Sequence, residues 1–291
     1  MKTENSFARR AIGDIRNAMT IDVEDYFQVS AFAQQISRES WPKQECRVEA
    51  NIDKILQLLA DAKIHATFFT LGWIAERYPT MVGRIVAGGH ELASHGFGHL
   101  RASDQTREQF HSDISSSKAL LEDISGQAVI GYRAPSFSIG AANLWALDSL
   151  YEAGYRYSSS IYPIAHDHYG MPEAPRFAFY PNGADGLLEI PVSTVQLMNK
   201  NLPAGGGGYF RFFPYSVSKW LIHRVNAMDR QPTIFYFHPW EIDPLQPRQQ
   251  GIGLKTRFRH YVNLSRTEAR LTNLMSDFKW GRMDKIFLAH P

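Results

Sequence analysis

The sequence predicts a parallel α/β fold of the barrel type, built as a single domain. Short apolar runs alternate with longer segments of helical periodicity through most of the chain, a rhythm typical of strands joined by helices. Polar groups follow several of the apolar runs directly, as they do at the carboxyl ends of barrel strands. The length of 291 residues suits one such barrel with a large buried core.

The first half of the chain supplies five of the expected strands. Phe68 and Phe69 illustrate their aromatic character, whereas Ile52, Ile55 and Leu59 recur at helical spacing. The expected strands are 18–21, 66–71, 90–93, 128–132 and 154–157. The expected helices are 47–62, 74–87 with a break at Pro79, 106–124 and 141–152.

The second half of the chain begins with a change of amino-acid composition. Proline and glycine become frequent between 159 and 208, and 204–208 reads as a flexible or tightly turned loop. Beyond this loop, apolar periodicity returns. The expected strands are 187–192 and 233–237, with 285–288 as a candidate closing strand. The expected helices are 215–228 and 264–278.

Composition excludes several classes of protein. The formal net charge of +2 is close to balance and argues against a nucleic-acid partner. The single cysteine, Cys46, rules out an internal disulfide framework and a multi-cysteine zinc site. We see neither a signal peptide nor a run of about 18 apolar residues. We therefore expect a cytoplasmic, soluble protein with no integral membrane segment, and a homo-oligomer stays open.

Two histidines four residues apart, His95 and His99, form the most informative motif. Residues at this spacing share one side of a helical turn or tight loop, so both imidazoles can reach one point. Imidazole is the commonest protein ligand for zinc, and a catalytic metal usually takes three protein ligands. The best source of the third is the acidic cluster 22–25. Such a site suits one divalent metal: zinc first, with cobalt, nickel, manganese or iron also compatible.

Three polar groups fall after strands whose carboxyl ends meet at one end of a barrel. The acidic cluster 22–25 follows the first strand, His95 and His99 follow the third, and Arg133 follows the fourth. A carboxylate beside a metal-activated water could act as general base, and Arg133 could orient it and hold it ionised. His238, after a later strand, could protonate a leaving group. The alternatives are a surface arginine and a packed strand-end histidine.

In order along the chain, these motifs resemble those of the NodB-like polysaccharide deacetylases, carbohydrate esterase family four. The resemblance runs from about 19 to 239 and rests on 20–25, 94–99, Arg133-Ala134-Pro135 and His238. It implies a distorted (β/α) barrel of about seven parallel strands, with a core over about 19–240 and a C-terminal extension over 241–291 of the single domain 1–291. It also implies metal-dependent removal of acetyl from N-acetylated amino sugars.

Carried over by motif, the resemblance gives each site residue a role. Asp22 is the general base, His95 and His99 are metal ligands, Arg133 orients the base, and His238 is the general acid. The sequence also departs from the family pattern in two places.

The first departure concerns the metal ligand. Val23 stands where the family has a second aspartate, so the carboxylate ligand is either Glu24 or Asp25. The second concerns the acid. Ser158-Ser159-Ser160 stands where many members carry an aspartate, which leaves Asp167 as a candidate to tune His238.

A subgroup resemblance narrows the expected substrate. The stretches 22–27, 206–211, 238–241 and 257–261 are similar to deacetylases found with bacterial exopolysaccharide biosynthesis. The expected substrate is thus an N-acetylated glycan, either the polymer or its lipid-linked precursor. Two other functions stay open. One is hydrolysis of a small cyclic amide, as in allantoinase-like relatives, and the other is a non-catalytic glycan-binding member of a biosynthetic complex.

Overall fold

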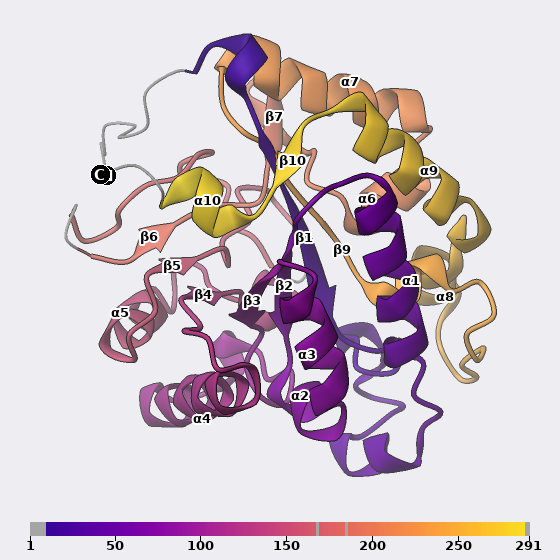
Figure 1. Cartoon of the computed structure of the whole chain (residues 1–291). Coiled ribbons are helices and arrows are strands. Elements are labelled where there is room, and N and C mark those ends of the chain that lie inside the picture. The colour runs from indigo at the N-terminus through magenta and orange to yellow at the C-terminus, as the bar shows by residue number, and fades with distance from the viewer. Residues whose placement is uncertain (1–9, 167–168, 184–185, 289–291) are drawn as a thin grey trace.

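The computed structural model describes residues 10–166, 169–183 and 186–288, which form a half-barrel of parallel strands with helices around it (Figure 1). The main sheet has eight strands; seven follow one another in the order β9-β1-β2-β3-β4-β5-β6, and β10 pairs with the first two residues of β1. All of these pairings are parallel. The predicted distorted barrel of about seven parallel strands is therefore confirmed.

The strands of this sheet are short, and most of their residues are buried on both faces. They are β1 (Asn17–Val23), β2 (Thr67–Thr70), β3 (Glu91–Ser94), β4 (Gly131–Tyr132), β5 (Tyr157–Ser158), β6 (Leu188–Glu189), β9 (Ile234–Phe237) and β10 (Trp280–Gly281). A separate antiparallel hairpin, which the sequence did not predict, consists of β7 (Thr194–Leu197) and β8 (Lys200–Pro203).

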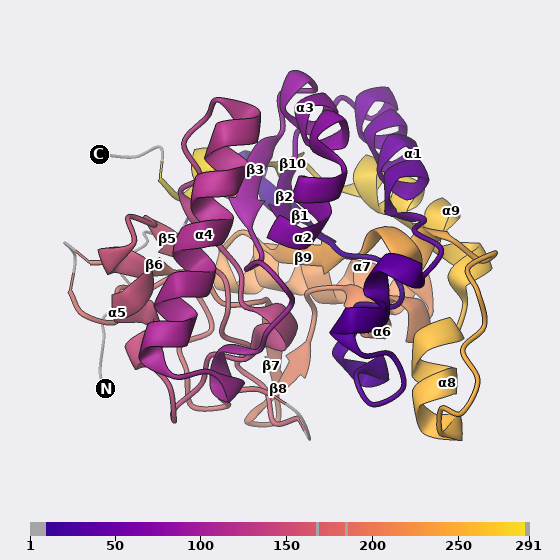
Figure 2. The ribbon, with the colours of Figure 1, turned by 90° about the horizontal axis from the view of Figure 1, so that it is seen from below.

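Helices α1, α3 and α4 lie side by side along one flank of the sheet in both views (Figures 1 and 2). The helices are α1 (Val48–Asp61), α2 (Gly72–Arg77), α3 (Pro79–Ala87), α4 (Arg107–Ser125), α5 (Trp145–Glu152), α6 (Gly207–Phe212), α7 (Tyr215–Arg224), α8 (Leu254–Tyr261), α9 (Leu264–Asp277) and α10 (Met283–Phe287). Within the described residues, no helix combines the length and apolarity needed to cross a bilayer.

The apolar stripe predicted for α1 packs against the central strand. Ile52, Ile55 and Leu59 are fully buried and share one core cluster with Ile21 and Val23 of β1. Burial of side chains of this size contributes about 1.5–3 kcal/mol each relative to exposure. The packing fixes α1 against β1, whose carboxyl end carries the acidic cluster.

The predicted closing strand at 285–288 is wrong. This segment belongs to α10, and the last strand of the sheet is Trp280–Gly281. A run of three apolar residues fits a buried helix as well as a strand, because it is too short to reveal a period. Ile286 and Phe287 bury their side chains from the helix.

The glycine run 204–208 is a tight turn that begins α6 and lies beside β9. The carbonyl oxygen of Gly205 accepts a hydrogen bond from the backbone of Tyr236 at 2.7 Å. Gly206 has φ 109° and ψ −143°, and a Cβ there would lie 2.2 Å from the carbonyl oxygen of Tyr236. Only glycine therefore permits this approach to the strand that leads to His238.

We expect Gly206→Ala to lower the free energy of unfolding by about 3 kcal/mol or more, because it adds both backbone strain and a clash. Gly83→Ala is the matched control: Gly83 lies on the exposed side of α3, and a Cβ added there would meet no atom within 4 Å, so alanine should add about 1 kcal/mol. Denaturant unfolding measures both changes. Equal effects at the two sites would contradict the tight turn.

Candidate active site

Six of the seven predicted site residues meet where β1, β3, β4 and β9 end. Figure 2, seen from below, looks onto this end of the barrel, because β1 runs downward in Figure 1. The six are Asp22, Glu24, His95, His99, Arg133 and His238; Asp25, the seventh, turns away.

Glu24, His95 and His99 form a cluster able to hold a metal ion. One ligand atom from each lies within 4.8 Å of the others, and all three residues are buried. His95 Nδ1 lies 2.8 Å from the carbonyl oxygen of Arg133; because a carbonyl only accepts, Nδ1 carries the proton and Nε2 keeps its lone pair. Glu24 Oε2 is buried without a hydrogen bond of normal geometry, although His99 Nε2 is only 2.8 Å away. This orphaned oxygen fits a metal ligand.

The protonation states of the cluster also suit a metal. Burial lowers the pKa of His95 to about 4, so its imidazole is neutral near pH 7. Burial acts to raise the pKa of Glu24, but His99 and His238 outweigh it and lower the pKa to about 2. A neutral imidazole and an ionised carboxylate are the forms that coordinate divalent metals.

Two side chains from outside the histidine motif hold the loop that carries it. Asp113 accepts a hydrogen bond at 3.1 Å from the backbone N–H of Phe97. Arg38 donates to the carbonyl oxygens of Gly98 at 2.7 Å and His99 at 3.0 Å. His99 itself has φ 52°, an uncommon left-handed conformation for a residue with a side chain. These contacts stabilise the backbone that aims its imidazole at Glu24.

Asp25 is turned away from the cluster and binds backbone. Its Oδ1 accepts from the N–H of Tyr26 at 2.8 Å, and its Oδ2 accepts from the N–H groups of Arg47 and Val48 at 2.6 and 2.9 Å. Val48 begins α1, so Asp25 satisfies free N–H groups at the amino end of that helix. Of the two carboxylates that the sequence left open, the structure brings only Glu24 to the histidines.

Asp22 is held by a fully buried arginine. Arg133 Nη1 donates to Asp22 Oδ1 at 2.6 Å and to Thr20 Oγ1 at 2.8 Å. The guanidinium also donates to the carbonyl oxygen and hydroxyl of Ser159 and lies 4.1 Å from the ring centroid of Phe69. A buried arginine charge needs a partner, and this pairing fixes the Asp22 carboxylate in place.

His238 reaches the same centre from β9. Its Nε2 lies 3.5 Å from Glu24 Oε1 and 3.9 Å from Asp22 Oδ2. Its Nδ1 lies 2.7 Å from Glu241 Oε1, and Arg211 Nε donates to the other oxygen of Glu241 at 2.5 Å. Burial acts to lower the pKa of His238, but the carboxylates of Glu24 and Glu241 outweigh it and raise the pKa to about 9.

Glu241 and Arg211 were not predicted as site residues. The available signal was the spacing of Glu241 three residues after His238, which brings the two side chains together in a helical turn. Asp167, the residue proposed from the sequence to tune His238, lies outside the described residues.

Trp240 and His260 support the centre. The indole Nε1 of Trp240 donates to Glu24 Oε1 at 3.2 Å. The indole lies between two imidazoles, with centroids 5.2 Å from His238 and 4.2 Å from His260. His260 Nε2 is 2.7 Å from Gln246 Oε1. The stack therefore restricts the orientation of both His238 and Glu24.

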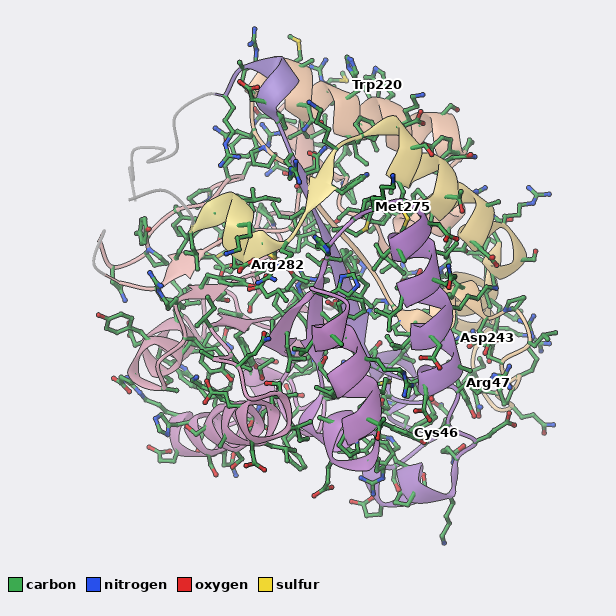
Figure 3. All side chains as sticks on the ribbon, viewed as in Figure 1. Cys46, Arg47, Trp220, Asp243, Met275 and Arg282 are labelled. Atoms are coloured by element: carbon green, nitrogen blue, oxygen red, sulfur yellow. The ribbon has the colours of Figure 1, made fainter. Side chains whose placement is uncertain are left out.

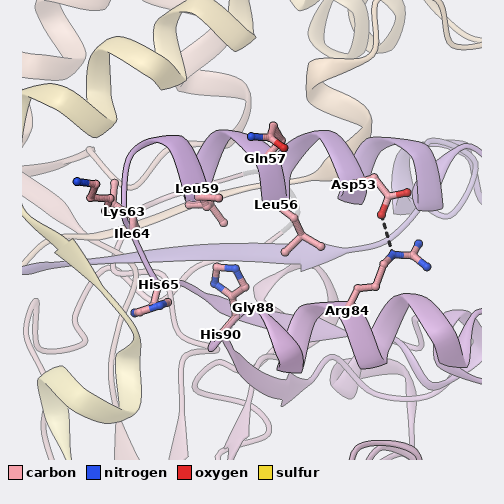
Figure 4. A pocket seen from close by; sticks show the side chains of 11 residues that line it. Asp53, Leu56, Gln57, Leu59, Lys63, Ile64, His65, Arg84, Gly88 and His90 are labelled. Atoms are coloured by element: carbon pink, nitrogen blue, oxygen red, sulfur yellow. Dashed lines mark hydrogen bonds and ion pairs between the residues drawn. The ribbon is translucent and has the colours of Figure 1, made fainter.

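Two hollows lie at different places relative to the cluster of Glu24, His95 and His99. One of about 190 Å³ is lined by His99 and by residues of the segment 27–41, so it adjoins the cluster. A larger one of about 590 Å³ lies between α1 and α3 and contains no site residue (Figure 4). Arg84 and Asp53 are joined across it by a 2.9 Å ion pair. Of these two hollows, the smaller can hold part of a substrate near the centre.

We expect Glu24→Gln to weaken zinc binding by more than about 100-fold, because an amide is a poor ligand and the loss exceeds that of an outer-shell partner. Asp25→Asn is the matched control. It should change zinc affinity little, but cost about 1–3 kcal/mol of unfolding free energy, because an amide cannot accept all three backbone N–H groups. Competitive chelator titration and denaturant unfolding separate the two effects. Zinc loss in Asp25→Asn alone would overturn this assignment.

Comparison with known proteins finds similarity to one family in residues 42–158. The family model described as polysaccharide deacetylase matches residues 42–158, and one described as a domain of unknown function matches 159–288. A peptidoglycan-N-acetylglucosamine deacetylase of Bacillus cereus is 32% identical over 103 residues, which are 35% of this chain and 46% of that protein. A chitooligosaccharide deacetylase of Sinorhizobium fredii is 41% identical over 83 residues, 28% of this chain and 39% of that protein. The chain thus spans less than half the length of these curated relatives.

Solved structures agree in fold. A Mycobacterium smegmatis protein named provisionally as a polysaccharide deacetylase superposes with a TM-score of 0.58 at 20% identity, over 96% of this chain and 92% of that one. The Bc1960 peptidoglycan N-acetylglucosamine deacetylase does so with a TM-score of 0.51 at 13% identity, over 97% and 90%. Residues 42–158 thus match the polysaccharide deacetylases, the NodB-like carbohydrate esterase family four, and the half-barrel of the whole chain has the fold of the solved structures named as such deacetylases.

Proposed function

We propose that this protein is a metal-dependent hydrolase that removes N-acetyl groups from amino sugars of a bacterial polysaccharide or its lipid-linked precursor. The observation that carries the proposal is the buried cluster of Glu24, His95 and His99, with Asp22 and His238 beside it. The relatives named as peptidoglycan and chitooligosaccharide deacetylases support the substrate class. The subgroup resemblance supports an exopolysaccharide substrate, and the proposed site of action is the cytoplasm.

The ligand set of two histidines and one carboxylate fits zinc best and also accommodates cobalt, nickel, manganese or iron. When bound, such a metal lowers the pKa of water and polarises the acetamide carbonyl. Glu24 takes the ligand role that Val23 leaves vacant in the family motif. This replacement favours a catalytic protein over a glycan-binding one, because the ligand set remains complete.

Asp22 is the proposed general base. Arg133 occupies Asp22 Oδ1, so Oδ2 is the oxygen directed toward His238 and the centre. From there it can take a proton from the attacking water. The buried guanidinium limits rotation of the Asp22 carboxylate and so keeps Oδ2 directed toward the centre.

His238 is the proposed general acid. Glu241 accepts the proton on Nδ1, so the proton on Nε2 is the one that faces the reacting groups. Transfer of that proton to the amine nitrogen lets the carbon–nitrogen bond break without expelling an amide anion. Burial acts to raise the pKa of Glu241, but the positive charge of Arg211 and the contact with His238 outweigh it and lower the pKa to about 2.

We also propose that 1–291 acts as one catalytic domain, with a core over about 19–240 and an extension over 241–291. The boundary between the two matched family models falls between Ser158 and Ser159, yet β5 and β6 pair across it. The proposed acid, His238, lies in the range 159–288, whereas the proposed ligands follow β1 and β3. Neither of the two matched ranges holds all the proposed catalytic groups.

The decisive test combines metal content with acetate release from N-acetylglucosamine oligomers. The protein purified without added metal should contain a divalent metal and release acetate. His99→Ala should lose the metal, and Asp22→Asn should keep it while kcat falls by about 100-fold to 10,000-fold. Metal without acetate release would redirect attention to cyclic amides. Failure to bind metal after reconstitution would favour a glycan-binding role.

The role of Glu241 predicts a dependence on the leaving group. Glu241→Gln should lower kcat on acetamides by about tenfold or more, but affect 4-nitrophenyl acetate less, because that ester expels its alcohol without acid assistance. Asp243→Asn is the control: Asp243 pairs with Arg47 rather than His238, and the two lie together in Figure 3. Equal losses on both substrates in Glu241→Gln would indicate a structural role only.

A further inference from the structure

Positive charge is concentrated in one segment near the C-terminus. The whole chain has 31 Lys and Arg against 29 Asp and Glu. The segment 244–267 has no Asp or Glu, but it contains five basic residues: Arg248, Lys255, Arg257, Arg259 and Arg266. All five are exposed. The segment therefore presents a local excess of positive charge that the net charge of the chain conceals.

Large apolar side chains are exposed in the same segment and beside it. Leu245 and Leu254 are 81% and 85% exposed, and Phe258 is 55% exposed. Phe212 of α6, 54% exposed, makes an edge contact with Phe258 with centroids 6.1 Å apart. Transfer of such apolar side chains out of water lowers the free energy of the system. We call Phe212 and the exposed face of α8 the α8 surface.

Along α8, the sequence places the exposed apolar side chains and the positive charges on different sides of the helix. Leu254 and Phe258, four apart, share one side, while Lys255 and Arg257 flank them in opposite directions around the helix. His260 faces inward and is buried against Trp240. An exposed apolar stripe bordered by cations is the pattern of helices that lie in a membrane interface.

The α8 surface lies close to the proposed centre. His260 of α8 stacks on Trp240 at 4.2 Å, and Trp240 stacks on His238 at 5.2 Å. Figure 2 shows α8 at the outer edge of the barrel end that carries the site, next to α6. A surface in contact with α8 would therefore lie at the same end of the barrel as the site.

We propose that the α8 surface docks on an anionic lipid bilayer. Charge complementarity favours this occupant: the basic residues attract the negative surface of the membrane, and the apolar stripe enters the interfacial region. Docking holds the centre next to lipid-linked glycans, a consequence that rests on the proposed function. The docking itself does not depend on catalysis.

Flotation of the full-length protein with vesicles tests the docking. The protein should bind vesicles of phosphatidylcholine with phosphatidylglycerol more tightly than vesicles of phosphatidylcholine alone, and added salt should weaken this binding. Lys255→Gln with Arg257→Gln should weaken it by about 25-fold, since each charge near the surface contributes about fivefold. Leu254→Ser with Phe258→Ser should abolish it.

Trp220→Ser with Arg224→Gln provides the matched control. Trp220 is exposed on α7, at the top of the view in Figure 3, whereas α8 lies at the right of the same view in Figure 1; the Arg224 guanidinium lies 5.8 Å from the Trp220 ring. This control should bind vesicles normally, and every variant should release acetate from soluble oligomers at the wild-type rate. That readout separates loss of docking from failure of the proposed function.

Three results would overturn the proposal. The first is that the protein does not bind anionic vesicles, and the second is that the α8 variants bind them as well as the control does. The third is that the protein binds no vesicles but self-associates, and that the Leu254→Ser, Phe258→Ser protein loses this self-association. The last result would assign the α8 surface to a second copy of this chain.

Discussion

The buried pair of Arg133 and Asp22 is the interaction on which the centre depends. The side chain of Arg133 positions the proposed base, and its carbonyl oxygen fixes the tautomer of His95. One residue thus connects the proposed base to the proposed metal ligands. Removing either partner would leave an uncompensated buried charge, which costs about 3–5 kcal/mol. The surrounding contacts with Thr20, Ser159 and Phe69 make the guanidinium tolerable inside the barrel.

The location of the site was predictable because it follows from topology. Parallel strands bring their carboxyl ends together, so polar residues after separate apolar runs had to converge. The choice between Glu24 and Asp25 was not predictable in the same way. The alternation of side chains along β1 ends at Val23, and beyond it a backbone turn decides which carboxylate faces the histidines. Asp25 instead binds the N–H groups at 47 and 48, which are distant in sequence.

The partner of His238 shows a second limit of sequence reasoning. Glu241 lies three residues from His238, but its charge is held by Arg211, which is 30 residues away and meets it only after folding. The serines 158–160, which stand where the family pattern has an aspartate, take part in the hydrogen bonds around Arg133. Ser159 accepts hydrogen bonds from the Arg133 guanidinium through its carbonyl oxygen and its hydroxyl, and Ser160 Oγ accepts from the N–H of Ala134. The serines that depart from the family pattern thus contact the Arg133-Ala134 motif on the neighbouring strand.

The pairing of β1 with β9 has a consequence for biosynthesis. β1 lies between β2 and β9, and Thr20 donates to the carbonyl oxygen of Phe235 across 215 positions of sequence. All three ligands of the cluster precede residue 100, whereas His238 and Glu241 emerge from the ribosome far later. Closing so long a loop is slow, and it must follow translation of β9. A nascent or truncated chain therefore has the proposed metal ligands long before it has the proposed acid, and under the proposed function hydrolysis of the amide bond waits for the finished barrel.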